Sequence, residues 1–99
     1  MKGCMLVMYV KIEWNHTYID HPKVYFLKIG MDGYETKKLE LYENGKICFT
    51  YDDIEQGTFL SEKPFEEIDE YNFSDKNESM TAIYISEEEF YYEWNARIK

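Results

Sequence analysis

Residues 38–50 have the sequence KLELYENGKICFT, and this stretch decides the fold. Apolar and polar residues alternate on both sides of Asn44-Gly45, which is the pattern of two half-buried strands joined by a hairpin turn. A two-residue turn would bring charged side chains onto the apolar face of the hairpin. A three-residue loop, with Gly45 in the left-handed conformation, instead places Leu41 opposite Ile47. We therefore predict the three-residue loop.

Further strand patterns flank this hairpin on both sides. Leu6 to Trp14 and Val24 to Ile29 alternate with the same period of two. Residues 81–85 alternate briefly, and residues 58–60 are a candidate for a short edge strand. Residues 52–57 are acidic and rich in turn formers, so we predict a turn there.

Two helices are predicted after these strands. Pro64 suits the first turn of a short helix. Near the C-terminal end, Ser86 and Glu89 have the spacing of a capping box, which predicts a helix that begins there. The residues expected to face inward are Phe65, Ile68 and Tyr71 in the first helix, and Phe90, Tyr91, Trp94 and Ile98 in the second.

The sequence therefore predicts an α+β fold. We expect an antiparallel sheet of four to five strands, with the short helix and the C-terminal helix packed on one face. The length of 99 residues suits one domain. We assign residues 8–99 to this domain and residues 1–7 to an N-terminal extension.

The cysteines and the apolar runs indicate a cytoplasmic protein. Cys4 and Cys48 have no C-x-x-C spacing and give no disulfide framework, so free thiols are expected. No run approaches the roughly 18 apolar residues that would span a bilayer. We therefore expect no association with a membrane.

Catalytic and metal-binding motifs are not evident. Either cysteine could meet His16 or His21 in space, but no motif supports a nucleophile, and Cys48 lies in a predicted strand. Asp20 beside the two histidines supplies ligand types, but their spacing matches no metal site. We expect no enzyme activity, no cofactor and no metal.

The charge is distributed unevenly along the chain. Residues 1–51 carry seven Lys and six Asp or Glu, whereas residues 52–99 carry four Lys or Arg and fourteen Asp or Glu. The second half therefore has a net charge of −10. This disfavours binding to nucleic acid, which needs a basic surface, and favours a basic protein partner. Acidity that serves solubility alone is the other interpretation.

Aromatic residues interleave with the carboxylates after residue 50, as a binder of a basic protein would need. Phe59 and Phe65 are expected in the core, so other rings would anchor the partner. The residues expected to contact the partner are Tyr51, Asp52, Asp53, Glu55, Glu66, Glu67, Asp69, Glu70 and Tyr71.

Two segments carry a resemblance to a known family. Residues 8–16, MYVKIEWNH, resemble the first strand of a family of small bacterial domains of unknown function, which open with an aliphatic-x-V-E-W-x-H strand. Residues 33–40, GYETKKLE, are similar to the family's G-Y-E-x-R-K-x-E hairpin, with Lys37 in place of Arg. Such domains look like the acidic cytosolic immunity proteins encoded beside bacterial toxins. By this analogy the resemblance implies a toxin inhibitor.

Our leading hypothesis is an immunity-type protein that blocks the active site of a basic toxin domain, such as a nuclease, and is a monomer or weak dimer. The alternative is a small-ligand-binding or enzymatic domain that uses Trp14, His16, Glu35 and Lys37. On our assignment of faces, Glu35 and Lys37 lie on the side of Leu39 and form an ion pair. A homo-oligomeric structural or regulatory protein is a third hypothesis.

Overall fold

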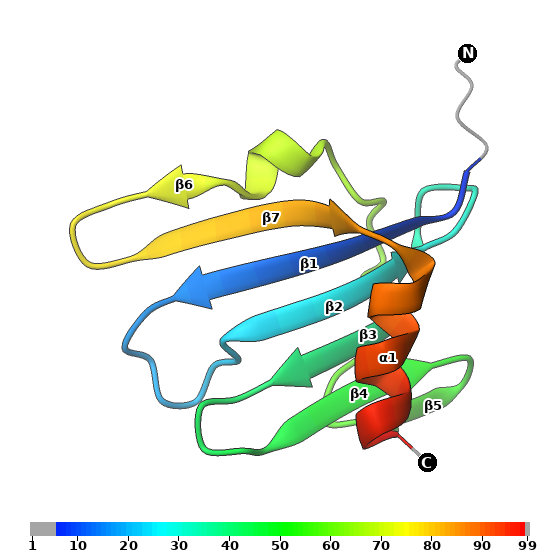
Figure 1. Ribbon diagram of the computed structural model, residues 1–99, viewed down its shortest axis with the longest axis horizontal. Coiled ribbons are helices and arrows are strands. Elements are labelled where there is room, and N and C mark those ends of the chain that lie inside the picture. The colour runs from blue at the N-terminus through cyan, green and yellow to red at the C-terminus, as the bar shows by residue number, and fades with distance from the viewer. Residues whose placement is uncertain (1–5, 99) are drawn as a thin grey trace.

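The computed structural model describes residues 6–98, and within this range the protein is mostly β (Figure 1). Seven strands form one antiparallel sheet in the order β5-β4-β3-β2-β1-β7-β6. The elements in chain order are β1 (Met8–Asn15), β2 (Val24–Ile29), β3 (Glu35–Leu41), β4 (Ile47–Tyr51), β5 (Ile54–Gln56), the 3₁₀ turn η1 (Ile68–Tyr71), β6 (Phe73–Ser74), β7 (Ser79–Ile85) and α1 (Glu87–Arg97). β7 therefore lies beside β1 in the sheet, and α1 follows β7 in the chain.

The prediction of four to five strands is wrong, because two short strands extend the sheet at its edges. β5 lies inside the stretch that we predicted as a turn, and it pairs with the end of β4. Asp52 has a φ of 52°, in the left-handed region that Asp tolerates, so the chain reverses within two residues. β6 has two residues and pairs with the start of β7. Strands this short contain too few residues for alternation to reveal them.

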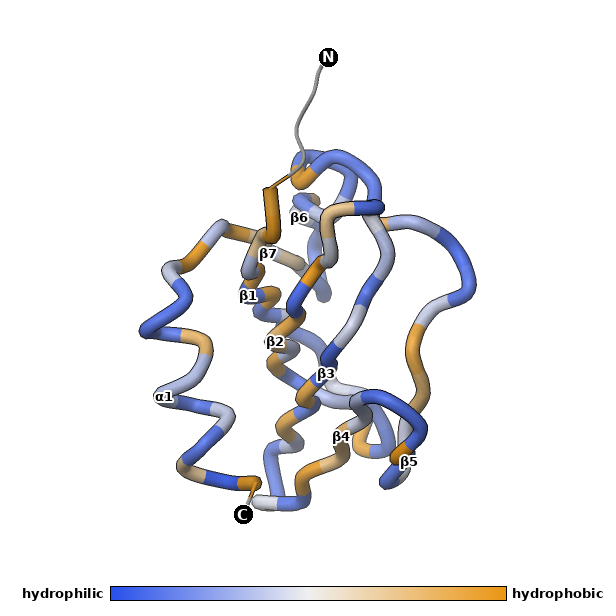
Figure 2. The backbone as a smooth tube through the Cα atoms, turned by 90° about the vertical axis from the view of Figure 1, so that its right-hand side faces the viewer, coloured by the Kyte–Doolittle hydropathy of each residue, from blue (hydrophilic) through white to orange (hydrophobic). Residues whose placement is uncertain are grey.

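The prediction of a helix that begins at Pro64 is also wrong. The helical part of this segment is η1, a single 3₁₀ turn that begins at Ile68. The Phe65 N–H donates a hydrogen bond to the Gly33 carbonyl at 2.8 Å, and the Phe65 ring stacks on Tyr71 with centroids 4.7 Å apart. These contacts take Phe65 out of a helical path. The segment lies on the face of the sheet opposite α1 (Figure 2), so the two elements do not share one face as predicted.

The register predicted for the central hairpin is confirmed. Leu41 pairs with Ile47, and Leu39 pairs with Phe49. Gly45 has a φ of 91°, as the three-residue loop requires. This register puts the apolar residues of β3 and β4 on the side that α1 covers.

The C-terminal helix is confirmed together with its cap. The Ser86 hydroxyl accepts a hydrogen bond from the Glu89 N–H, and a Glu89 carboxylate oxygen accepts one from the Ser86 N–H. Phe90 and Trp94 on the inner side of α1 are buried against Phe26 and Leu39. In residues 6–98, no helix has both the length and the apolar composition needed to cross a bilayer.

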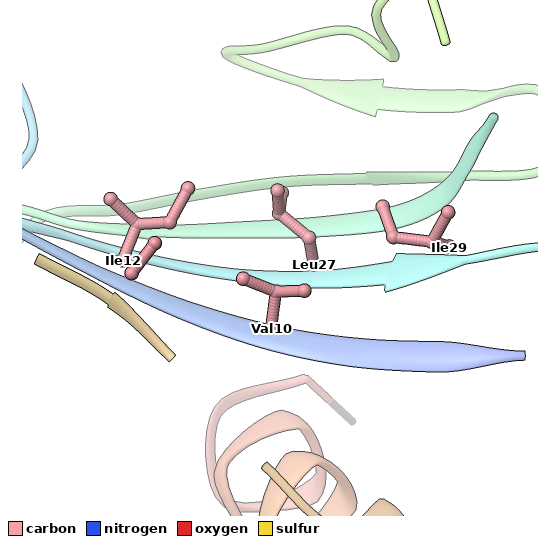
Figure 3. Close-up of a cluster of buried hydrophobic side chains, with 5 residues drawn as sticks. Val10, Ile12, Leu27 and Ile29 are labelled. Atoms are coloured by element: carbon pink, nitrogen blue, oxygen red, sulfur yellow. The ribbon is translucent and has the colours of Figure 1, made fainter. Parts of the chain in front are cut away.

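A second apolar layer lies on the other side of the sheet. Val10, Ile12, Leu27 and Ile29 point away from α1 (Figure 3), and Ala82 completes the cluster. The side chains that cover it from the following loop and η1 are Phe65, Ile68 and Tyr71. The inward orientation predicted for these three residues is thus correct, although the helix is absent.

Candidate functional site

Residues 52–70, which we call the acidic strap, connect the two edges of the sheet. The strap leaves β4, forms β5, and then crosses the face opposite α1 to reach η1, which lies against β7 (Figures 1 and 2). It contains eight Asp or Glu residues and one Lys, a net charge of −7. The carboxylates are Asp52, Asp53, Glu55, Glu62, Glu66, Glu67, Asp69 and Glu70.

Three ionisable side chains of β3 hold the strap against the sheet, and we call them the β3 clamp. The bonds run from Thr58 Oγ1 to Glu40 Oε2 (2.9 Å), from Lys38 Nζ to the Phe59 carbonyl oxygen (3.1 Å), and from the Ser61 N–H to Glu35 Oε1 (2.9 Å). Lys38 and Glu35 also form an ion pair at 3.1 Å, and their side chains are only 14% and 10% exposed. An irregular segment needs partners for its backbone groups, and the clamp supplies them.

A β-bulge sets the face on which the clamp lies. The register between β2 and β3 shifts between Lys28 and Ile29, so that Lys28 pairs with Lys37 and Ile29 pairs with Glu35. Glu35 therefore lies on the strap side and Lys37 on the α1 side. Our prediction of an ion pair between Glu35 and Lys37 is wrong for this reason. The Lys37 ammonium instead lies 4.9 Å from the ring centroid of Tyr51 and 5.0 Å from that of Trp94.

Glu40 of the clamp and two partly buried tyrosines close to it favour their neutral forms. Burial raises the pKa of the Glu40 carboxyl, and the hydrogen bond from Thr58 partly offsets that rise. Burial, together with Cys48 and Glu40 nearby, raises the pKa of Tyr42 to about 12. Burial and the charge of Glu40 raise the pKa of Tyr25 further. These groups belong to the packing under the strap.

Cys48 is sealed beneath the strap. The residue is 3% exposed, and a Cβ added at Gly57 would meet its Sγ at 2.5 Å. A thiol enclosed in this way offers no access to a substrate. Cys4, the other candidate nucleophile, lies outside the described residues.

The carboxylates of the strap form none of the ion pairs found in residues 6–98. These pairs are Lys11–Glu13, Lys23–Glu43, Lys38–Glu35 and Arg97–Glu93. Lys28, Lys37 and Lys46 lie over aromatic rings instead. The negative charge of the strap therefore remains uncompensated by basic side chains of the described part of the chain.

The predicted contact residues separate into two groups along the strap. Asp52, Asp53 and Glu55 lie at the β5 edge, whereas Glu66 to Glu70 lie at the η1 end beside β7. Five strand spacings of roughly 4.8 Å separate β5 from β7, which makes about 24 Å. One partner would have to cover this width in order to contact both groups.

The two predicted anchors, Tyr51 and Tyr71, lie on opposite faces of the sheet. The Tyr51 ring packs edge-on against Trp94 with centroids 5.5 Å apart, whereas Tyr71 stacks on Phe65. Both rings are partly buried. The structure does not bring them to a common surface.

Phe59 is the aromatic side chain of the strap that we failed to identify. We placed it in the core, but it is 64% exposed, while its carbonyl is held by Lys38. The clamp bonds fix its orientation, and they join segments that are about twenty residues apart in the sequence. No periodicity in residues 57–61 could have revealed this arrangement.

The other candidate residues gather at the far end of β1. Trp14, His16, Tyr18 and His21 form a cluster in which the rings of Trp14 and His16 are 4.1 Å apart. The indole N–H of Trp14 donates to Glu78 at 2.7 Å, which ties this cluster to the turn between β6 and β7.

His16 is a structural residue in this cluster. It is 5% exposed, and its Nδ1 accepts the Tyr18 backbone N–H at 2.9 Å. The proton must therefore be on Nε2, which donates to the Pro22 carbonyl at 2.8 Å. With both nitrogens engaged by the backbone, the imidazole is not available as a base or a metal ligand.

A broad surface hollow of about 660 Å³ lies beside this cluster, between the β1–β2 loop and the β3–β4 hairpin. Lys23 and Glu43 contribute its charged groups, which are 3.6 Å apart. The four residues of our alternative hypothesis do not meet there. Glu35 lies at the opposite end of β3, about 20 Å away at 3.3 Å per residue, and Lys37 faces α1.

No group of three or more His, Cys, Asp or Glu side chains in residues 6–98 is arranged to hold a metal ion.

Comparison with known proteins shows one family. No curated protein and no solved structure matches the chain. The model of the family described as "Domain of unknown function (DUF6881)" matches residues 8–99. Because this match covers nearly the whole sequence, the chain belongs to the DUF6881 family of domains of unknown function.

Proposed function

We propose that this protein is a bacterial, cytoplasmic immunity-type inhibitor that binds a basic toxin domain, such as a nuclease, through the acidic strap. The observation that carries the proposal is the clamped strap itself, whose eight carboxylates lack basic side-chain partners within residues 6–98. In this mechanism the carboxylates take the place of substrate phosphates and cover the active site of the toxin. The inhibitor contributes no catalytic step.

The rigidity of the strap supports this role. Binding costs free energy when a flexible segment has to become ordered, and a segment that is already fixed avoids much of that cost. The β3 clamp and the bond from Phe65 to Gly33 fix the strap at four points between residues 58 and 65. The pairing of β5 with β4 holds the carboxylates before this stretch, and the packing of η1 against β7 holds those after it, so the strap presents its charges in a defined arrangement.

Phe59 gives this surface an apolar anchor. Interfaces gain most of their affinity from a few desolvated side chains, whereas charges mainly accelerate the encounter. The 64% exposed ring lies between Glu55 and Glu62 in the sequence. It is also suited to stacking with an arginine of a basic partner.

The experiment compares two triple charge reversals that leave the same net charge. The test variant is E66K/E67K/E70K, and the control is D20K/E43K/D75K, whose positions are exposed and lie outside the strap. Affinity is measured for a panel of purified basic nuclease toxin domains, which includes the product of the reading frame next to the gene. We expect the test variant to lose at least tenfold in affinity while the control loses little. An equal loss of affinity in both variants would show that net charge alone determines binding. A loss of affinity in the control alone would show that the strap is not the binding surface.

The hollow beside His16 favours a second candidate function, the binding of a small ligand. Its volume of about 660 Å³ is in the range of ligand sites, and Lys23 and Glu43 could orient a polar molecule. A fragment screen by NMR tests this function. Saturable shifts in residues 16–19, abolished by K23A, would favour it, and their absence at millimolar concentration would exclude it.

A further inference from the structure

A groove runs between α1 and the strands β1 and β7, on the face opposite the strap. α1 has eleven residues and is about 16 Å long, so it covers only part of a seven-stranded sheet (Figure 1). The groove beside it has a volume of about 350 Å³. Its lining residues are Lys11, Phe26, Ile85, Glu88, Glu89, Tyr92 and Glu93.

The groove combines an apolar floor with exposed apolar edges. Phe26 and Ile85 belong to the core cluster beneath α1 and form the floor, in which Phe26 is buried with the Lys11 ammonium 5.8 Å from its ring centroid, while Ile85 is only partly buried. Tyr92 on α1 is 75% exposed, and Ile83 on β7, which pairs with Lys11, is 49% exposed. Exposed apolar side chains that border a groove with a polar rim are typical of an interaction site.

The rim of the groove is negatively charged. Glu88, Glu89 and Glu93 lie on its α1 side, and Lys11 is the basic lining residue. Lys11 is paired with Glu13 at 3.3 Å, so its charge is already balanced. Arg97 pairs with Glu93, and Glu89 caps the helix, while Glu88 makes neither kind of contact in residues 6–98. A ligand that fits this groove therefore carries positive charge next to an apolar group.

We propose that this groove binds a short basic segment of another protein. An aliphatic side chain of the segment lies on Ile85, beside Tyr92 and Ile83. Lysine or arginine side chains of the segment pair with Glu88 and with Glu89 next to it. This surface is separate from the acidic strap, because the sheet lies between them, and it does not depend on the proposed function.

The test uses three blocked hexapeptides in amide-detected NMR titrations of the full chain: RLRRLR, hexaarginine and ELEELE. We expect RLRRLR to give saturable shifts at residues 83–85 and 88–93, and to bind at least fivefold more tightly than hexaarginine. ELEELE should give no saturable shift. The variants I83T and E88Q should each weaken the binding of RLRRLR at least threefold. Tyr84, the exposed neighbour of Ile83 whose side chain points to the other face of β7, provides the control variant Y84S, which should leave binding unchanged.

Three outcomes would overturn this inference. The first is the absence of saturable shifts with RLRRLR, and the second is equal binding of ELEELE. The third is a set of shifts confined to residues 52–70, which would support the strap and reject the groove. Shifts at the groove alone would support the groove and leave the toxin-binding experiment on the strap to decide the proposed function.

Discussion

Glu40 is a residue at which burial and charge oppose each other. The residue is 8% exposed, and its carboxylate accepts a hydrogen bond from Thr58. Burial raises the pKa of this carboxyl above its ordinary value of 4.5. The folded protein then holds a proton at pH values where the unfolded chain has lost it. The resulting stabilisation is complete below about pH 4.5, and it disappears as the pH rises through the pKa of the folded state.

Glu40→Gln should remove this dependence on pH. The urea midpoint of the wild type, relative to that of the variant, should fall as the pH rises from 4.5 toward 7.5. The measurement is a series of urea denaturation curves for both proteins over this range. If the difference between the two urea midpoints is the same at every pH, Glu40 has the same pKa in the folded and unfolded states.

Phe59 is the residue whose removal should affect binding without affecting the fold. Its ring is largely exposed, so Phe59→Ala should leave the free energy of unfolding nearly unchanged. Binding to a toxin domain should weaken about tenfold, mainly through faster dissociation, as expected for an anchor residue. Surface plasmon resonance gives both rate constants. An unchanged dissociation rate would remove Phe59 from the interface.

For single residues, the predicted face of the sheet is correct where apolar and polar residues alternate regularly, and it is wrong where a bulge or a loop interrupts that alternation. Leu41 and Ile47 pair as predicted, because only one register buries both apolar sets. Glu35 was placed on the wrong face, because one bulge between Lys28 and Ile29 reverses the alternation beyond it. Phe59 looked like a core residue, because its exposure depends on hydrogen bonds to distant residues.

At the scale of elements, the β3 clamp explains how an irregular strap can be part of a stable fold. Lys38→Met should release the strap locally, because it removes the bond to the Phe59 carbonyl and the ion pair with Glu35. Amide hydrogen exchange at residues 59–61 should become at least tenfold faster, while exchange in β1 and β2 changes little. If Lys38→Met does not fold, the milder Glu35→Gln should speed exchange at Ser61 in the same direction.

The matched control for this experiment is Lys37→Met. Lys37 is next to Lys38 on the same strand, but it faces Tyr51 and Trp94 under α1. This variant should leave exchange in the strap unchanged. Equal acceleration in both variants would show a general loosening of β3 and would contradict the clamp.

The predictability of the elements follows their length and their local signals. The C-terminal helix was predicted with its cap, because Ser86 and Glu89 specify its start within one turn. β5 and β6 were missed, because strands of three and two residues depend on their neighbours and not on their own pattern. Pro64 suggested a helix, but the contacts of Phe65 with Gly33 and Tyr71 prevail over that local preference.

At the scale of the whole molecule, the charge is arranged on two different surfaces. The strap carries a net charge of −7 on one face, and the glutamates of α1 border the groove on the other. The sequence predicted the acidic half of the chain but not its division by the sheet. That division depends on the strap crossing the face opposite α1 (Figure 2), which follows from contacts between distant residues. A protein partner can therefore approach one acidic surface without touching the other.

The most direct test of the central claim is the association rate of the protein with a basic toxin domain as a function of salt. If the strap steers the encounter, the wild-type rate should fall steeply between about 50 and 300 mM salt, because exposed charges are screened over roughly 8 Å at physiological ionic strength. E66K/E67K/E70K should associate more slowly and with a much shallower dependence on salt, whereas D20K/E43K/D75K should keep the wild-type slope. Wild-type and strap-reversal proteins with the same slope would contradict the account.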